Sequence, residues 1–195
     1  MKLCLLTILA AFSLVAAGQA MPAALKASVA EPALPETMGG CSLKCGFAWS
    51  VEILAAGGQK PAATKKLNDE NAETAWIAAG GTSGVGVKLK LVFPKKLHAE
   101  MEGQTPLYGL DIINGNWINE QQWKAHARVK KARLYYREKP FADVNFADSR
   151  RWQRLSFPDF FVRSGDSMTL EILEVYPGEN GAGVAITEIV LQGAH

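Results

Sequence analysis

The sequence contains few of the side chains that most often bind zinc or act as nucleophiles. It has 3 cysteines and 3 histidines among 195 residues. A zinc site at Cys41 and Cys45 would need two more ligands, and the three histidines show no ligand spacing. The sequence also shows no Ser–His–Asp constellation and no pair of carboxylates at a spacing typical of hydrolases. We therefore expect a protein that is not an enzyme.

A strong excess of one charge is also missing. The chain has 21 basic and 19 acidic residues, which gives a formal net charge of +2. Such a balance provides no long-range attraction to nucleic acid or to an anionic membrane. Residues 124–133 are locally basic, but on a strand their charges would be divided between two faces. We therefore expect no nucleic-acid partner.

The apolar run at the amino terminus is too short to cross a membrane. Residues 3–17 form 15 uncharged positions that follow Lys2 and precede the small residues Gly18 and Ala20. A spanning helix needs roughly 20 residues. The pattern is typical of a secretory signal peptide over residues 1–20. We expect an exported protein, periplasmic or secreted, whose mature chain has no stable membrane insertion.

Residues 21–45 are predicted to be an Ala/Pro-rich linker, because they lack any apolar period. This segment contains Cys41 and Cys45. The third cysteine, Cys4, would be lost with the leader. In an oxidising compartment Cys41 and Cys45 most simply form a disulfide with each other. A crosslink over so short a loop would stiffen a turn more than it would stabilise the fold.

Residues 46–195 read as one domain of short strands separated by turn signals. The clearest strand is 87–93, where apolar residues alternate with Lys88 and Lys90 until Pro94 ends it. Further strands are expected at 47–54, 107–113, 132–136, 152–157, 168–176 and 184–191. The alternation slips at Ile172, which indicates a bulge. Only residues 118–125 are a candidate helix, so we predict an all-β, antiparallel jelly-roll β-sandwich.

The most polar part of the domain is the segment 67–76, which ends at Trp76. Within it, Asp69, Asn71 and Thr74 offer oxygen atoms at spacings of two and three residues. One interpretation is a tight turn in which these side chains bond to the backbone and Trp76 fills the core behind them. The same oxygens are ligands that a hard cation such as Ca²⁺ prefers. The residues alone leave both interpretations open.

Six short motifs occur in an order that resembles a known family. They are L-N-D-x-N-x-x-T-A-W from Leu67, G-V-G-V-K-L-K-L-V-F from Gly84, I-I-N-G-N-W from Ile112, A-R-V-K-K-A-R-L from Ala127, V-Y-P-G from Val175 and A-I-T-E-I-V-L from Ala185. Together they resemble a discoidin-like domain of the galactose-binding superfamily, in the branch named after the translocation domain of streptococcal NAD glycohydrolase. The resemblance covers residues 47–193. In that family this domain accompanies the catalytic domain and is not itself catalytic.

The resemblance implies a structural Ca²⁺ at the opening turn. Asp69 and Glu188 would supply carboxylates, and Asn71 and Thr74 would supply side-chain or carbonyl oxygens. Glu188 lies in an apolar strand, where an unpaired carboxylate would be costly, so it needs a cation or a buried hydrogen-bond network. The alternative is that Asp69 and Glu188 accept hydrogen bonds from backbone donors without a metal.

The resemblance also implies ligand recognition through loops at one end of the sandwich. The predicted ligand-binding residues are Asn114, Trp117, Trp123 and Arg128. The two tryptophans flank a polar turn, where exposed indoles could stack on a sugar ring, although such residues can equally fill a core. The sequence therefore predicts an exported, non-catalytic binding module for a glycan or other envelope component. The alternative is an envelope scaffold that binds a protein partner and no small ligand.

Overall fold

The computed structural model describes residues 23–26, 28–29, 52–55, 61–78, 83–95, 103–157 and 160–193. The expected leader and the predicted disulfide between Cys41 and Cys45 lie outside the described residues. The described elements, in chain order, are β1 (Ala23–Lys26), β2 (Ser28–Val29), β3 (Glu52–Ala55), α2 (Pro61–Thr64), the 3-10 helix η1 (Lys65–Leu67), β4 (Trp76–Ile77), β5 (Lys88–Val92), β6 (Thr105–Asn114), α3 (Glu120–Ala125), β7 (His126–Tyr136), β8 (Lys139–Asn145), β9 (Trp152–Ser156), β10 (Phe161–Val162), β11 (Ser167–Tyr176) and β12 (Ala182–Gly193).

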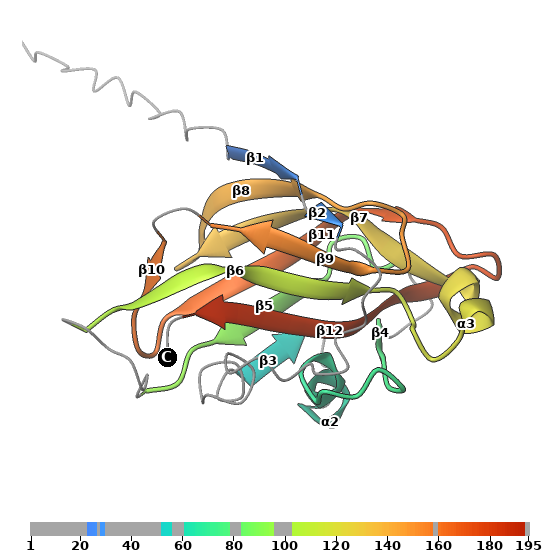
Figure 1. Ribbon diagram of the computed structural model, residues 1–195, viewed down its shortest axis with the longest axis horizontal. Coiled ribbons are helices and arrows are strands. Elements are labelled where there is room, and N and C mark those ends of the chain that lie inside the picture. The colour runs from blue at the N-terminus through green and yellow to red at the C-terminus, as the bar shows by residue number, and fades with distance from the viewer. Residues whose placement is uncertain are drawn as a thin grey trace, which may run out of the picture.

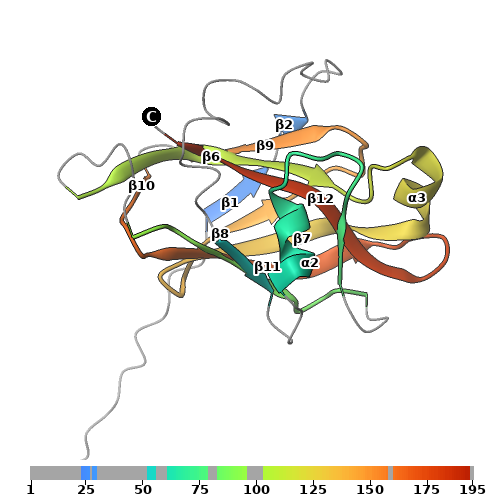
Figure 2. The same cartoon turned by 90° about the horizontal axis from the view of Figure 1, so that it is seen from below.

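The strands form two mainly antiparallel layers. One layer has the order β2–β9–β6–β12, with β10 paired to β6 and β4 paired to β12. The other has the order β8–β7–β11–β5–β3, with β1 added in parallel to β8. A short parallel pairing of β12 with β7 joins the two layers. Figures 1 and 2 show α3 at one end of the sandwich and β10 at the other. The predicted β-sandwich is confirmed.

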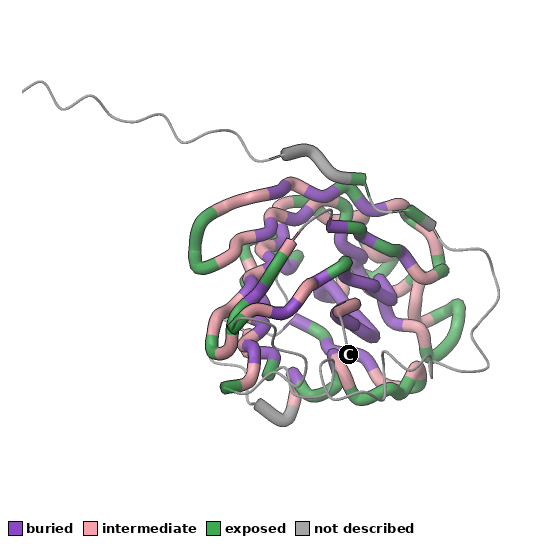
Figure 3. Tube along the Cα trace, turned by 60° about the vertical axis from the view of Figure 1, so that its left-hand side comes forward, coloured by how far each residue is buried: buried purple, intermediate pink, exposed green. Residues whose placement is uncertain are grey.

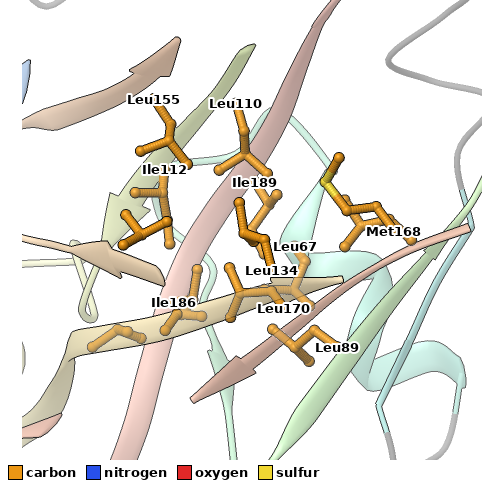
Figure 4. Close-up of a cluster of buried hydrophobic side chains, with 14 of the residues drawn as sticks. Leu67, Leu89, Leu110, Ile112, Leu134, Leu155, Met168, Leu170, Ile186 and Ile189 are labelled. Atoms are coloured by element: carbon orange, nitrogen blue, oxygen red, sulfur yellow. The ribbon is translucent and has the colours of Figure 1, made fainter. Parts of the chain in front are cut away.

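The core lies between the layers and follows from the alternation of the sequence. In β5, Leu89 and Leu91 are buried, while Lys88 is exposed. Figure 3 shows buried and more exposed residues alternating along the strands. Figure 4 shows side chains of both layers meeting, among them Leu110, Ile112 and Ile189 from one layer and Leu134, Met168 and Leu170 from the other. Burying each such side chain stabilises the fold by about 1.5–3 kcal/mol.

The strands expected from the sequence are found where the structure describes them, with local differences; residues 47–51 of the first one lie outside the described residues. The bulge predicted at Ile172 is confirmed, because the register of β11 against β7 shifts between Ile172 and Glu174. The helix α3 lies within the segment expected to be helical. β8 was not predicted, because its hairpin turn has no glycine. Arg137 and Glu138 adopt positive φ values of 48° and 64° there.

Within the predicted linker, residues 21–45, two short stretches pair with the edges of the sheets. Ala23–Lys26 form β1 on the edge of one layer, and Ser28–Val29 form β2 on the edge of the other. Such pairing uses backbone groups at open sheet edges, so it needs no apolar period in the sequence. The rest of the segment lies outside the described residues.

Candidate functional site

The opening turn lies between η1 and β4, beside β12 (Figure 2). The Asp69 carboxylate accepts hydrogen bonds from the Asn71 amide at 3.1 Å and from the Thr74 hydroxyl at 3.0 and 2.8 Å. The Asn71 side-chain oxygen accepts from the Glu73 amide at 2.9 Å. Trp76, which follows the turn, is buried. The tight turn predicted from the spacing of these residues is therefore confirmed.

Glu188 approaches this turn from β12. Its neighbours Ile189 and Leu191 point into the core, so alternation places Glu188 on the opposite face of the strand. The turn covers that position, and Glu188 is only 1% exposed. The Asn71 amide donates to Glu188 Oε1 at 3.1 Å as well as to Asp69. The structure thus brings Asp69 and Glu188, which are far apart in the sequence, to the same backbone amide.

The Glu188 carboxyl is only partly satisfied in this position. Its second oxygen, Oε2, is buried and has no hydrogen-bond partner among the described residues. Burial raises the pKa of Glu188 to about 8. The hydrogen bond from Asn71 opposes this rise, while the nearby Asp69 and Glu70 add to it. Among the described residues, one oxygen of this buried carboxyl is therefore left unsatisfied.

The four predicted cation ligands fit that role unequally. Asp69 and Glu188 present carboxylate oxygens to one place, and the unpartnered Oε2 of Glu188 suits a cation. The Thr74 hydroxyl and the Asn71 side-chain oxygen already have partners within the turn. The described residues contain no group of three or more His, Cys, Asp or Glu side chains placed to hold a metal. Ca²⁺ takes six to eight oxygens, so backbone carbonyls and water would have to complete its shell.

The predicted ligand-binding residues lie at the α3 end of the sandwich. Asn114 is 1% exposed, and its side-chain amide bonds to the backbone of Val129 in both directions, at 2.8 and 2.9 Å. Its own carbonyl accepts from the Trp123 indole at 3.1 Å. Gly115 follows with φ 93°, and a Cβ there would lie 2.6 Å from Trp123. Asn114 and Trp123 thus fasten β6 to β7 and α3.

Arg128 is also engaged within the protein. Its guanidinium donates to both carboxylate oxygens of Asp148 at 3.0 and 2.8 Å. It donates further to the carbonyls of His126 and Pro177, both at 3.0 Å. Its guanidinium carbon lies 4.5 Å from the Trp123 ring centroid. Asp148 and Pro177 could not be assigned to Arg128 from the sequence, because both contacts depend on how the loops fold together.

Trp117 differs from the other three residues. Its backbone amide donates to the Thr187 hydroxyl at 3.0 Å, and its carbonyl accepts from Arg150 at 2.8 Å. Its side chain is partly exposed, with Arg150 over the ring at 5.4 Å. The indole N–H has no hydrogen-bond partner in the described part of the chain. This N–H is buried, so the accessible part of Trp117 is its partly exposed ring.

A separate groove of about 420 Å³ lies on the outer face of the β3–β5–β11–β7 layer. It is lined by Leu54, Ala55, Lys88, Lys90, Tyr135, Glu138 and Thr169. The groove could not be predicted from the sequence, because polar positions that alternate along a strand look the same on any solvated sheet face.

Among the described helices, none has the length and apolar character needed to cross a membrane.

Several solved structures share this fold. CpGH89CBM32-5 from Clostridium perfringens, solved in complex with GalNAc-beta-1,3-galactose, is 14% identical, with a TM-score of 0.50 over 74% of this chain and 96% of that one. The CBM32-1 and CBM32-2 domains of Clostridium perfringens ZmpB, solved in complex with GalNAc, are 13% identical, with a TM-score of 0.57 over 87% of this chain. The match covers 42% of that longer chain.

The sequence also matches a described family over most of its length. No curated protein matches the chain. The translocation domain of Streptococcus pyogenes NAD+-glycohydrolase is 20% identical over 56% of this chain, with a TM-score of 0.37. Residues 48–192 match the family described as the NAD glycohydrolase translocation F5/8 type C domain. The chain therefore belongs to this family.

Proposed function

We propose that this protein is an exported, non-catalytic binding module that recognises a glycan or another component of the cell envelope. The observation that carries the proposal is its fold, which it shares with domains solved in complex with GalNAc-containing sugars. A fold alone does not fix a function, so the binding residues have to be argued from the site.

The loops at the α3 end are the proposed binding surface. Trp117 contributes a partly exposed ring. Asn114, Trp123 and Arg128 hold these loops in place through their internal hydrogen bonds and act as positioning residues. This division of roles refines the set of residues expected from the sequence.

A Ca²⁺ ion at the opening turn is the proposed structural cofactor. Asp69 and Glu188 would hold it, together with oxygens of the turn. The support is the buried Oε2 of Glu188, which has no partner among the described residues. A bound cation would neutralise the two carboxylates and tie the turn to β12. In this role it stabilises the domain and takes part in no reaction.

An envelope scaffold that binds a protein partner is the second candidate function. It is favoured by the family description, which assigns these domains to the translocation of an NAD glycohydrolase. A scaffold of this kind would bind its partner in the absence of any sugar, and its binding would not compete with free glycans.

Glycan-array binding of the mature chain, followed by calorimetry on the best ligand, tests the proposal. We expect Trp117→Leu to weaken binding by roughly threefold to tenfold, because a stacked aromatic contact is lost. Trp152→Leu on β9 is the matched control and should leave the affinity unchanged. Absence of binding to every glycan on the array would rule out the glycan-binding function. Binding to an envelope protein without competition by sugars would favour the scaffold.

A further inference from the structure

The groove on the outer face of the β3–β5–β11–β7 layer follows from the register of its strands and the sizes of the side chains that this register aligns. The sheet register aligns Leu54, Lys90, Thr169 and Tyr135 in one row across four strands. Thr169 is short and stands between the long side chains of Lys90 and Tyr135, so the row is hollow at its centre. Three strand spacings of about 4.8 Å make the row about 14 Å long. A volume of about 420 Å³ lies within the range of small-ligand sites.

The next row of the same face is electrically balanced. It aligns Lys88, Glu171, Arg133 and Asp143, so its charges alternate in sign. Lys88 Nζ lies 3.6 Å from Glu171 Oε1, and Arg133 Nε lies 2.6 Å from Asp143 Oδ1. These four charges compensate one another and leave no net attraction for a ligand.

Lys90 is the groove cation with the weakest internal compensation. Its ion-pair partner on this face is Glu138, at 3.9 Å, and the Glu138 side chain is 85% exposed. An exposed pair at that separation contributes little. The Lys90 side chain is 44% exposed. Its ammonium group can therefore pair with an anionic group that enters the groove.

The remaining lining suits a ring that carries hydroxyl groups. Tyr135 is held in place, because its hydroxyl donates to Glu171 and Lys88 Nζ lies 5.4 Å from the ring centroid. Leu54 and Ala55 add apolar surface at the β3 end, and the side chain of Thr169 adds a hydroxyl at the centre. A rigid aromatic ring, a few polar groups and one available cation together match a sugar that bears a carboxylate.

We propose that this groove binds a short acidic oligosaccharide, with a uronic-acid carboxylate on Lys90 and a sugar ring against Tyr135. The inference rests on the proposed function in that the ligand is a glycan. It adds a second site on the sheet face, separate from the loops at the α3 end. The two sites differ in their cations: at the loop site Arg128 is engaged by Asp148 and two carbonyls and Arg150 donates to the Trp117 carbonyl, whereas the partner of Lys90 is 3.9 Å away and exposed.

Calorimetric titration of the mature chain with α-1,4-linked tetragalacturonate tests this site, with its methyl ester as the neutral counterpart. Wild type should bind the acid form, and the ester should bind roughly threefold to tenfold more weakly. Lys90→Gln should weaken binding of the acid form by a similar factor and leave binding of the ester unchanged. Tyr135→Leu should weaken binding of both forms. Lys130→Gln on β7 removes the same charge outside the groove and is the matched control.

Equal binding of the acid and the ester, or equal losses in Lys90→Gln and Lys130→Gln, would overturn the groove site. Glycan binding on the array that depends on Trp117, together with no binding of tetragalacturonate, would overturn the groove and leave the proposed function standing. Absence of binding to any sugar would overturn both. Variants whose melting temperature equals that of wild type exclude unfolding as the cause of a lost affinity.

Discussion

Two buried carboxylates on the β6–β12 strand pair have opposite environments. Asp111 is 6% exposed and receives the Arg154 guanidinium through two hydrogen bonds of 2.8 and 2.7 Å, with a third from Gln192 at 3.1 Å. Glu188 is 1% exposed and, within the described part of the chain, receives a hydrogen bond from the Asn71 amide. Both side chains lie on the same outward face of this layer, two residues apart in register.

The difference follows from where each partner comes from. Arg154 stands directly opposite Asp111 on the neighbouring strand β9, so the sheet register itself supplies the counter-charge. Opposite Glu188, the register supplies Ile113, and the covering turn adds the acidic residues Asp69 and Glu70. A buried carboxylate is tolerated when a charge and hydrogen bonds satisfy it, and costs free energy when they do not. Asp111 is therefore satisfied by its partners, whereas one oxygen of Glu188 has no hydrogen-bond partner among the described residues.

The largest expected change in stability comes from removing the arginine that pairs with Asp111. Arg154→Met removes the guanidinium and leaves a buried carboxylate with Gln192 as its remaining side-chain donor. We expect the free energy of unfolding to fall by about 2–3 kcal/mol, which is less than for a fully buried pair because the Arg154 side chain is largely exposed. Urea unfolding measures the loss.

Two further variants make this measurement specific. Arg151→Met removes an exposed arginine from the same segment and should change stability by less than about 0.5 kcal/mol. Asp111→Asn combined with Arg154→Met removes the uncompensated charge and should recover part of the loss. A double variant as unstable as Arg154→Met alone would contradict the charge-based explanation.

A second experiment measures how the stability of the protein changes with pH, because the raised pKa of Glu188 makes it pH-dependent. In the presence of a chelator, its pKa is about 8 in the folded protein, above the ordinary value of 4.5. The folded state then holds a proton that the unfolded state has released, so stability falls as the pH rises towards 8. At 1.36 kcal/mol per pH unit, the loss between pH 6 and pH 8 is about 2 kcal/mol.

The Glu188→Gln variant identifies the group responsible. It cannot titrate, so its stability should vary less with pH than that of wild type over the same range. Asp111→Asn is the control and should retain the slope of wild type. Parallel pH profiles for wild type and Glu188→Gln in chelator would show that Glu188 does not keep its proton when the domain folds.

The comparison also shows how far the sequence could predict this molecule. Most strands were predictable, because residues such as Leu89 and Leu91 alternate with lysines and proline ends the run. β8 was not, since its turn at Arg137 and Glu138 requires positive φ without a glycine or asparagine signal. A strand can therefore be predicted where the hydrophobic period of the sequence and the residues of the adjoining turn agree. The prediction fails where the turn has none of the residues that usually form it.

The site was predictable only in part, for a different physical reason. The opening turn follows from short-range spacing, so Asp69, Asn71 and Thr74 could be grouped from the sequence. Its meeting with Glu188 was implied by the family resemblance, since the segments are more than a hundred residues apart. No sequence pattern shows that Asp111 has an ion-pair partner and that Glu188 has an unsatisfied oxygen. Which side chains face each carboxylate depends on the register of β6 against β9 and β12.

The smallest predicted change in stability is the one caused by the proposed cation, which would give Glu188 the counter-charge that Asp111 already has. A ligand that binds only the folded state stabilises it by RT ln(1 + [L]/Kd), which is about 1.4 kcal/mol at a concentration tenfold above Kd. For millimolar Ca²⁺ and a weak extracellular-type site, the melting temperature should rise by about 3–6 °C over the value in chelator. Asp69→Asn and Glu188→Gln should each abolish this rise, while Asp111→Asn should retain it, because Asp111 already has its guanidinium. A melting temperature of wild type that is indifferent to both Ca²⁺ and chelator would mean that no cation fills the place, and that the Glu188 carboxyl keeps its proton and remains within the hydrogen-bonded turn.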